Sequence, residues 1–352
     1  MTGRERGPWR AALLVLGVTV ALSLALTLLH VPSAVLFGAL LGGMAHALTS
    51  PRVLALPAWV FRGGQGLIGI TIGSLVSLSD LGAMGPALLP ILAVTVGTIA
   101  ISLLAGRVLA VRSDVSRVTG AFAMIAGGAS GVVAVARDLG ADDRVVTVVQ
   151  YLRVFVVLVT IPLVTGVVFH PDHGLGRFDA GGASLPADLG YTAVALAGGL
   201  LLARLVPVST ATLLGPLVVA VALSATGWWG EPVVPTALQW LAYAVIGVQV
   251  GLRFTRASLA SIARMLPVVL LIIVAMVAAT ALMGALLAWL TPVDGLTAYL
   301  ATTPGGLFAV LAIAADSGSD VTYVMAVQLF RLLVILAFTP LLARLLRARG
   351  GR

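Results

Sequence analysis

Two stretches of this chain share one pattern of glycine, aspartate, glutamine and arginine: AGGASGVVAVARDLGADDRVVTVVQYLR (residues 126–153) and PGGLFAVLAIAADSGSDVTYVMAVQLFR (residues 304–331). Each recurring residue lies 178 positions after its counterpart. The recurring pairs are Gly127/Gly305, Gly128/Gly306, Asp138/Asp316, Gly140/Gly318, Asp142/Asp320, Gln150/Gln328, Arg153/Arg331, Pro162/Pro340, Gly69/Gly247 and Gly73/Gly251. Because the offset is constant, we interpret the chain as a tandem duplication with almost no insertion. Its repeat is too long for a solenoid.

The composition is that of a membrane protein. Hydrophobic residues make up 60% of the chain and charged residues 10%, and the mean hydropathy is +1.13. Long apolar stretches of this kind mark membrane-spanning helices, so we predict an all-α polytopic membrane protein. The net charge of +8 comes from arginines, mostly at segment ends, and reports orientation in the lipid bilayer rather than a nucleic-acid partner. The absence of cysteine excludes disulfides and thiolate chemistry.

Each half contains six apolar segments. They cover residues 10–30, 33–49, 57–79, 86–111, 118–137 and 143–167 in the first half, and 190–206, 209–226, 237–254, 265–290, 295–315 and 321–344 in the second. Residues 1–169 form the first membrane repeat, the polar residues 170–189 a linker, and residues 190–352 the second repeat. The N-terminal stretch resembles a signal peptide but flows into further membrane segments, so we interpret it as a retained first helix.

Arginines at the segment ends predict the topology, since arginine-rich loops stay in the cytoplasm. The predicted cytoplasmic parts are Arg4–Arg10, Arg52–Arg62, Arg107–Arg117, Arg253–Arg264 and Arg344–Arg352. The loops around Asp80, Trp228–Glu231 and Asp294 have no arginine and are expected outside. We therefore expect a multi-pass protein of the bacterial cytoplasmic (inner) membrane with both termini in the cytoplasm.

This topology requires one segment of each half to enter and leave the membrane on the same side. The fifth segments are the natural choice, since Gly127-Gly128 and Pro304-Gly305-Gly306 lie at their centres. Proline breaks a helix, and glycine permits the positive φ angles of a chain reversal. Each half then has about five transmembrane helices and one re-entrant hairpin, and the odd number of crossings makes the halves inverted repeats. A broken helix that crosses fully is the alternative.

Charged side chains inside the sixth segments indicate the functional site. Arg153 and Arg331 lie near the bilayer midplane, where an arginine costs about 2.5 kcal/mol or more. Gln150 and Gln328 precede them by three positions and so share their helical face. Two inward-facing cations beside two glycine-rich hairpins predict an anion site. The predicted substrate-binding residues are Gly127, Gly128, Ser130, Gln150, Arg153, Thr303, Pro304, Gly305, Gly306, Gln328 and Arg331.

Several of these features also have a structural interpretation. The arginines could bond hairpin carbonyls that the break leaves unsatisfied. Asp142 and Asp320 stand just before the sixth segments, where aspartate caps a helix. The spaced glycines of the third segments are typical of close helix packing. His170 and His173 lack further ligands nearby, so we predict no metal site.

The second copy of the pattern, Pro304-Gly305-Gly306, Asp316-x-Gly-x-Asp320, Gln328-x-x-Arg331 and Pro340, resembles the AbrB-type membrane protein family. So does the glycine-rich stretch Gly63–Gly69. The resemblance covers essentially the whole chain, although the first copy has Ala126 where the family pattern has a proline before the two glycines. The family is often labelled an ammonia monooxygenase or a regulator of one. The dispersed histidines offer no copper or iron site, so we expect neither a cofactor nor an enzyme.

The broader architecture is similar to the sodium/proton antiporter and bile-acid symporter superfamily and to 2-hydroxycarboxylate transporters, an analogy at the level of fold alone. The leading expectation is a secondary transporter or exporter of a small, anionic organic solute. The alternative is a membrane regulatory or sensor protein without transport activity, linked to regulation of gene expression by the family label. The expected partners are the solute and the lipid bilayer, with a homodimer as a further possibility and no nucleic acid.

Glycine substitutions follow from the same analysis. If Gly305 and Gly306 form a reversal with positive φ, Gly306→Val should abolish function. Gly251→Ala, at a helix-packing position, should be milder.

Topology can be tested with single cysteines, because the chain has none of its own. In intact cells, we expect Arg256→Cys to be protected from an impermeant maleimide and Asp179→Cys to be labelled. Labelling after permeabilisation is the control for both variants. External labelling of Arg256→Cys, or protection of Asp179→Cys, would contradict the inverted arrangement.

Overall fold

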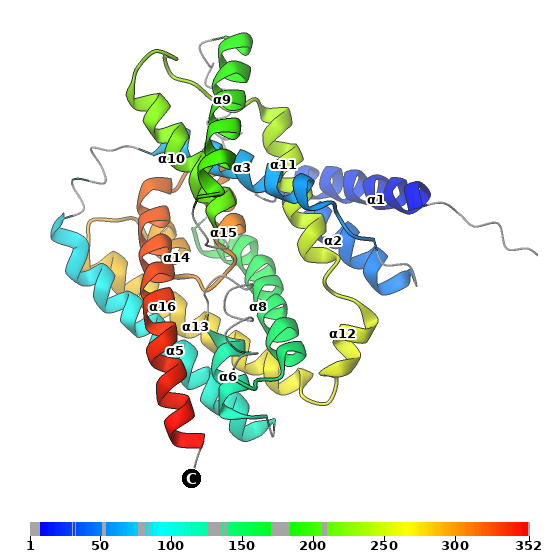
Figure 1. Cartoon of the computed structure of the whole chain (residues 1–352), viewed down its shortest axis with the longest axis vertical. Helices are drawn as coiled ribbons and strands as arrows, with labels where there is room; N and C mark the ends of the chain where they lie inside the picture. The colour runs from blue at the N-terminus through cyan, green and yellow to red at the C-terminus, as the bar shows by residue number, and fades with distance from the viewer. Residues whose placement is uncertain are drawn as a thin grey trace, which may run out of the picture. The chain divides into compact units, whose positions relative to one another are not determined.

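The computed structural model consists of α-helices joined by turns, and the part of the chain that it describes contains no β-strand (Figure 1). It describes residues 8–29, 31, 33–50, 54–76, 82, 85–113, 115–125, 136, 139–169, 184–205 and 210–350. The all-α class predicted from the composition is confirmed.

The chain divides into two compact units, which are described separately. The first comprises Met1–Ser74 and His173–Ala257, and the second comprises Leu75–Asp172 and Ser258–Arg352. The first unit thus takes the first three segments of each half, and the second unit takes the last three. The compact units and the sequence repeats are therefore different divisions of the chain.

The first unit contains six helices in the described residues: α1 (Pro8–Leu28), α2 (Ala34–Thr49), α3 (Ala58–Leu75), α9 (Leu185–Ala203), α10 (Ala211–Ala225) and α11 (Thr236–Gly251). Helix α9 begins before the predicted boundary at residue 190, because Ser184 caps it: Ser184 Oγ accepts a hydrogen bond from Ala187 N at 3.4 Å. The last part of the predicted linker is therefore helical, and residues 170–183 lie outside the described chain.

Glycines of the third segments bring helices from opposite halves into close contact. A Cβ added to Gly251 of α11 would come within 3.0 Å of Leu40 O in α2, and one added to Gly69 of α3 would overlap Leu213 O in α10. The same crowding occurs at Gly73 and Gly247. Since no side chain fits there, the predicted packing role is confirmed. The third helix of each half thus packs on the second helix of the other.

The second unit contains the remaining segments. From the first half come η1 (Gly85–Ala87), α5 (Leu88–Arg112), α6 (Arg117–Met124), α8 (Asp143–Val164) and the π-helical turn η2 (Thr165–Phe169). From the second half come α13 (Leu266–Leu290), α14 (Gly295–Thr302), α15 (Leu307–Asp316) and α16 (Val321–Gly350). A short helix that was not predicted, α12 (Arg256–Ser261), lies in the arginine-rich loop at the boundary of the units.

Four of the described helices are long and apolar enough to cross a membrane: Gly85–Arg112, Asp143–Phe169, Leu185–Ala203 and Leu266–Leu290. Six shorter apolar helices accompany them: Ala12–Leu28, Ala34–Thr49, Ala211–Ala225, Thr236–Gly251, Leu307–Asp316 and Val321–Ile335. Large apolar side chains on these helices are exposed, such as Leu89 at 75% and Leu271 at 70%. Apolar surface on this scale suits lipid rather than water, so the helices indicate a membrane protein, as predicted.

The fifth segment of the second half forms a hairpin, with α14 and α15 separated by the residues Thr303–Gly306 (Figure 1). Thr297, in the first turn of α14, lies beside the start of α16, since Thr297 Oγ1 accepts a hydrogen bond from Asp320 N at 2.9 Å. Helix α15 ends at Asp316, one short turn before Asp320. The segment therefore enters and leaves at the same end of α16, which is the geometry of a hairpin rather than of a broken crossing helix.

The prediction of a positive φ at Gly305 and Gly306 is wrong. Gly306 has a φ of −74°, and Gly305 is not among the described glycines with positive φ. A Cβ on Gly306 would meet Val154 Cγ1 at 3.5 Å, which is an ordinary contact. Positive φ occurs instead at Gly140 (75°) and Gly318 (70°), in the turns before the sixth helices. At these turns glycine avoids the strain of a left-handed residue.

These contacts reverse the expected order of the glycine variants. We expect Gly251→Ala to lower the melting temperature more than Gly306→Ala, because only the methyl group at 251 overlaps a backbone oxygen, that of Leu40. Gly17→Ala is the control, since a Cβ there meets nothing within 4 Å. Thermal unfolding of the purified variants in one detergent measures the order. Equal, small shifts at 251 and 306 would contradict the close helix contact.

Candidate functional site

Arg331 and Gln328 of α16 bind the tip of the second hairpin. Arg331 Nη1 donates to Thr303 O at 3.0 Å and to Thr302 O at 3.3 Å. Gln328 Nε2 donates to Leu300 O at 2.9 Å and to Thr303 O at 3.2 Å, and Gln328 Oε1 accepts from Arg331 Nη2. These carbonyls lie at the C-terminal end of α14, where a helix runs out of internal donors. Two side chains on one face of α16 therefore complete the hydrogen bonding of the hairpin tip.

The first half repeats this arrangement. Gln150 Nε2 donates to Phe122 O at 2.8 Å, and Arg153 Nη1 donates to Met124 O at 2.9 Å. These acceptors precede Leu300 and Thr302 by the same 178 positions that separate the arginines, so the duplication extends to the backbone contacts. The structural interpretation, in which the arginines bond hairpin carbonyls, is confirmed.

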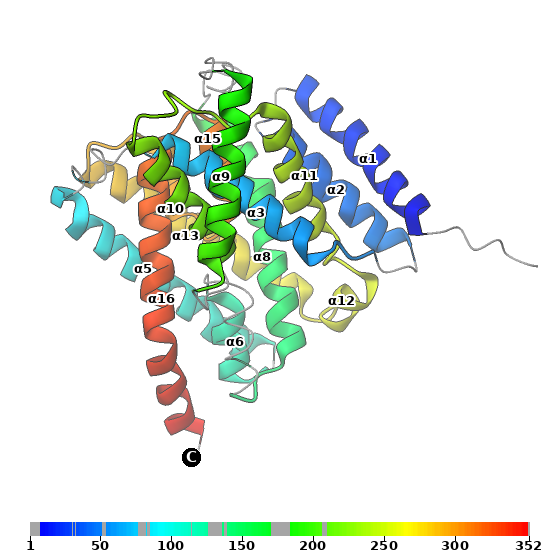
Figure 2. The ribbon, with the colours of Figure 1, turned by 45° about the horizontal axis from the view of Figure 1, so that its top comes forward.

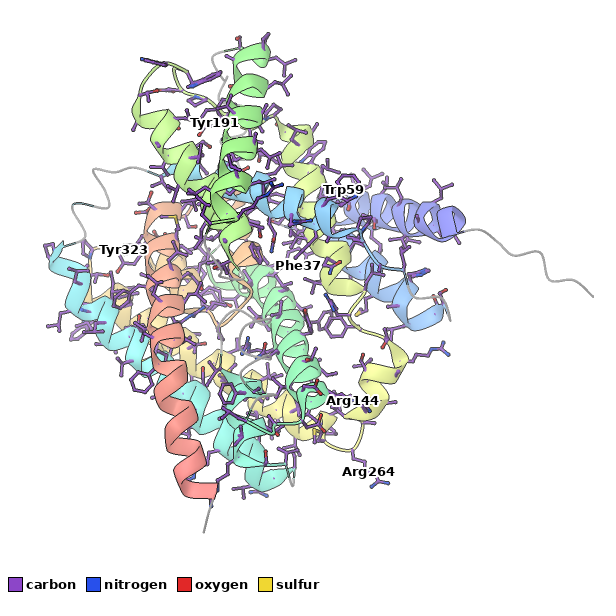
Figure 3. The ribbon with its side chains drawn as sticks, viewed as in Figure 1. Phe37, Trp59, Arg144, Tyr191, Arg264 and Tyr323 are labelled. Carbon is purple, nitrogen blue, oxygen red and sulfur yellow. The ribbon has the colours of Figure 1, made fainter. Side chains whose placement is uncertain are left out.

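Both arginines are buried, and neither forms an ion pair with a residue of the described chain. Arg153 is 4% exposed and Arg331 is 5% exposed, whereas Arg144 and Arg264 are exposed at helix starts (Figure 3). The Nε atoms of Arg153 and Arg331 are buried and have no hydrogen-bond partner in the described chain. Buried cations held by neutral groups, with donors left over, favour an anionic ligand.

The aspartates before the sixth helices cap them, as predicted. Asp142 Oδ1 accepts from Arg144 N at 3.0 Å and from Val145 N at 3.2 Å. Asp320 Oδ1 accepts from Tyr323 N at 2.9 Å. The caps satisfy N–H groups that the first helical turn leaves free. These carboxylates therefore lie at the helix starts, away from the mid-helix positions of the arginines.

Two threonines that fix the bases of the hairpins were not among the predicted residues. Thr119 Oγ1 accepts from Asp142 N at 3.0 Å, and Thr297 Oγ1 accepts from Asp320 N at 2.9 Å. Each bond ties the first turn of a hairpin to the start of the next helix. The signal that could have found them is the repeat itself, because the threonines are also separated by 178 positions.

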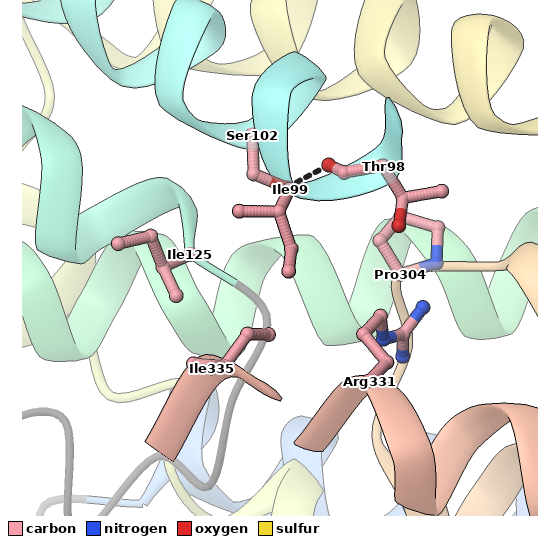
Figure 4. Close-up of a pocket in the computed structure, with 7 residues that line it drawn as sticks. All are labelled: Thr98, Ile99, Ser102, Ile125, Pro304, Arg331 and Ile335. Atoms are coloured by element: carbon pink, nitrogen blue, oxygen red, sulfur yellow. Dashed lines mark hydrogen bonds between the residues drawn. The ribbon is translucent and has the colours of Figure 1, made fainter. Parts of the chain in front are cut away.

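A narrow pocket adjoins Arg331, whose guanidinium group points toward Pro304 (Figure 4). The lining comes from α5, α16, the residue after α6 and the tip of the second hairpin: Thr98, Ile99, Ser102, Ile125, Pro304, Arg331 and Ile335. The free volume inside the pocket is about 10 Å³, which is about the space of one water molecule. The pocket therefore does not admit a whole organic solute in this conformation. Thr98 and Ser102 were not predicted, since hydroxyl groups are common in apolar helices.

The structure brings part of the predicted set together. Pro304 and Arg331 line the pocket. Thr303, which precedes Pro304 in the chain, accepts a hydrogen bond from Gln328. The Gly305-Gly306 pair faces valines of α8. Gln150 and Arg153 hold the end of α6 through Phe122 O and Met124 O. The tip of the predicted first hairpin lies outside the described chain, with three predicted site residues: Gly127, Gly128 and Ser130.

Comparison with known proteins agrees with the sequence pattern. The family described as "Transition state regulatory protein AbrB" matches residues 35–347. The chain is 33% identical over 335 residues to "Putative regulator AbrB" of Escherichia coli (strain K12), covering 93% of this chain and 94% of that protein. It is 24% identical over 350 residues to "Uncharacterized protein YhjN" of Bacillus subtilis (strain 168), covering 90% of each. Because the match spans both halves and both hairpins, the chain belongs to the AbrB family.

Proposed function

We propose that this chain is a secondary transporter of a small organic anion, and that Arg153 and Arg331 bind the negative charge of the solute. The observation that carries the proposal is the pair of buried arginines whose Nε atoms lack partners in the described chain. An arginine in the membrane interior costs about 2.5 kcal/mol or more, and neutral carbonyls offset only part of this. A carboxylate at the free Nε would neutralise the charge and use the remaining donor.

The shape of the guanidinium group allows two roles at once. Nη1 of Arg331 is used by the carbonyls of Thr302 and Thr303, and Nη2 bonds Gln328. The Nε–H group is left over, and it lies in the same rigid plane. One side chain can therefore hold the hairpin with one part of the group and bind an anion with another.

The opposite directions of the sixth helices support alternating access. In Figures 1 and 2, α8 and α16 of the second unit run in opposite directions. In Figure 3, Arg144 at the start of α8 and Tyr323 at the start of α16 lie at opposite ends of this unit. We infer that hairpins tied to these two helix starts enter the membrane from opposite sides, which is the arrangement that the arginine distribution predicts. In transporters with inverted repeats, a midplane site opens first to one side and then to the other.

We infer from the same predicted topology that the protein lies in the bacterial cytoplasmic membrane, with both termini in the cytoplasm. The apolar helices and the arginine-rich loops support this placement. We infer that the protein acts without a cofactor and catalyses no covalent reaction, because the proposed role uses only charge and hydrogen bonding.

The second candidate is a membrane regulator or sensor that binds the anion without moving it. The names of the family and of the Escherichia coli relative favour this candidate. Both candidates use the same site, so net solute movement separates them. In liposomes, a transporter exchanges labelled solute across the bilayer, whereas a sensor binds it without exchange.

Substitution of Arg331 tests the anion role. A thermal-shift screen of small carboxylates in detergent first identifies a binder, because a ligand of the folded state raises the melting temperature. We expect Arg331→Gln to weaken the affinity for that carboxylate by about tenfold or more, as a charge-assisted hydrogen bond is lost. Arg331→Lys should recover only part, since lysine keeps the charge but lacks the planar fork.

The matched control is Gln328→Leu, which removes bonds to Leu300 O and Thr303 O without removing charge. We expect this variant to melt at a lower temperature but to bind the carboxylate with nearly wild-type affinity. Wild-type affinity in both Arg331 variants would remove the arginine from the site and leave the anionic solute without support.

A further inference from the structure

The tip of the second hairpin has the chemistry of a cation site. Helix α14 ends inside the protein, where Leu300, Thr302 and Thr303 are buried. A helix C-terminus carries about half a negative charge and several carbonyl oxygens without internal donors. Pro304 adds to the deficit because it has no N–H group to donate to Leu300 O. Converging carbonyl oxygens at the end of a half-helix are ligands that suit sodium or another monovalent cation.

The chain places its own cation at these oxygens. Arg331 Nη1 donates to two of them, Thr302 O and Thr303 O, while Gln328 Nε2 shares Thr303 O and also reaches Leu300 O. At the end of α6, the guanidinium group of Arg153 donates to the carbonyl oxygen of Met124, the last residue of that helix. Each of these two helix ends thus has a fixed positive charge at its carbonyl oxygens.

We propose that the tip of the second hairpin is a monovalent-cation site filled by a guanidinium group of the chain itself, that of Arg331, and that Arg153 fills the corresponding site at the end of α6. The two sites then need no sodium ion, either to keep the protein folded or to bind solute. This inference goes beyond the proposed function, because it concerns the cation requirement and holds for a sensor as well as for a transporter.

Removal of the guanidinium group provides the test. Arg331→Ala leaves the carbonyls of Thr302 and Thr303 without this donor and opens a space of guanidinium size beside them. The purified full-length protein in detergent is melted in choline chloride, sodium chloride and methylguanidinium chloride at equal ionic strength. We expect the wild-type melting temperature to be the same in sodium as in choline. We expect Arg331→Ala to melt lower in choline and to recover at least half of the loss, saturably, in methylguanidinium.

Further variants keep the test decisive if Arg331→Ala fails to fold. Arg153→Ala empties the site at the end of α6 and should also be recovered by methylguanidinium. Arg331→Lys keeps a cation in place and should not respond to it. The matched control is Gln328→Leu, which loses the bonds to Leu300 O and Thr303 O but leaves the guanidinium group in place, so methylguanidinium should not restore its melting temperature.

Three outcomes would overturn the proposal. The first is saturable stabilisation of the wild-type protein by sodium but not by choline. The second is an absence of methylguanidinium recovery in the alanine variants that fold. The third is equal recovery of Gln328→Leu, which would mark the effect as a general action of the salt.

Discussion

When a helix ends inside an apolar protein, its last carbonyl oxygens need hydrogen-bond donors from elsewhere in the chain. The second unit depends on this requirement. Helix α14 ends at the tip of the second hairpin and α6 ends at Met124, and in each case a glutamine and an arginine of the following sixth helix supply the donors. Threonine bonds at the hairpin bases and aspartate caps set the position of that helix. Each buried carbonyl left unpaired would cost about 1–3 kcal/mol, so the two helix ends depend on these side chains.

The first unit is held together by a different interaction. Its helices approach backbone to backbone through glycine, as where Gly251 of α11 lies against Leu40 of α2. Between membrane helices, such contacts rest on van der Waals packing, because lipid provides no hydrophobic driving force. No arginine is buried among the described residues of this unit. The two buried arginines and the candidate solute site therefore belong to the second unit, whereas the buried Asp188 of the first accepts a hydrogen bond from Val233 N at 3.1 Å.

The duplication made the side chains of the site predictable from the sequence, but not their partners. A constant offset selects Gln150 with Arg153 and their counterparts, because both copies keep the same contacts. It cannot select Thr303 O or Met124 O, since a backbone carbonyl carries no residue-type signal. The sequence predicts a positive φ at Gly305 and Gly306, whereas in the structure it occurs in the turns at Gly140 and Gly318. The third helix of each half packs on the second helix of the other half, and this pairing depends on long-range contacts. The periodicity of one segment does not encode such contacts.

The two arginines link solute binding to hairpin position in the proposed transporter. The guanidinium group of Arg331 holds the tip of the second hairpin, and that of Arg153 holds the end of α6. An anion that contacts both guanidinium groups would be attracted to both, and so would favour a closer approach of the segments that they hold. The solute then has a higher affinity for the closed arrangement than for the open one. Such a difference is the requirement for any ligand that shifts a conformational equilibrium.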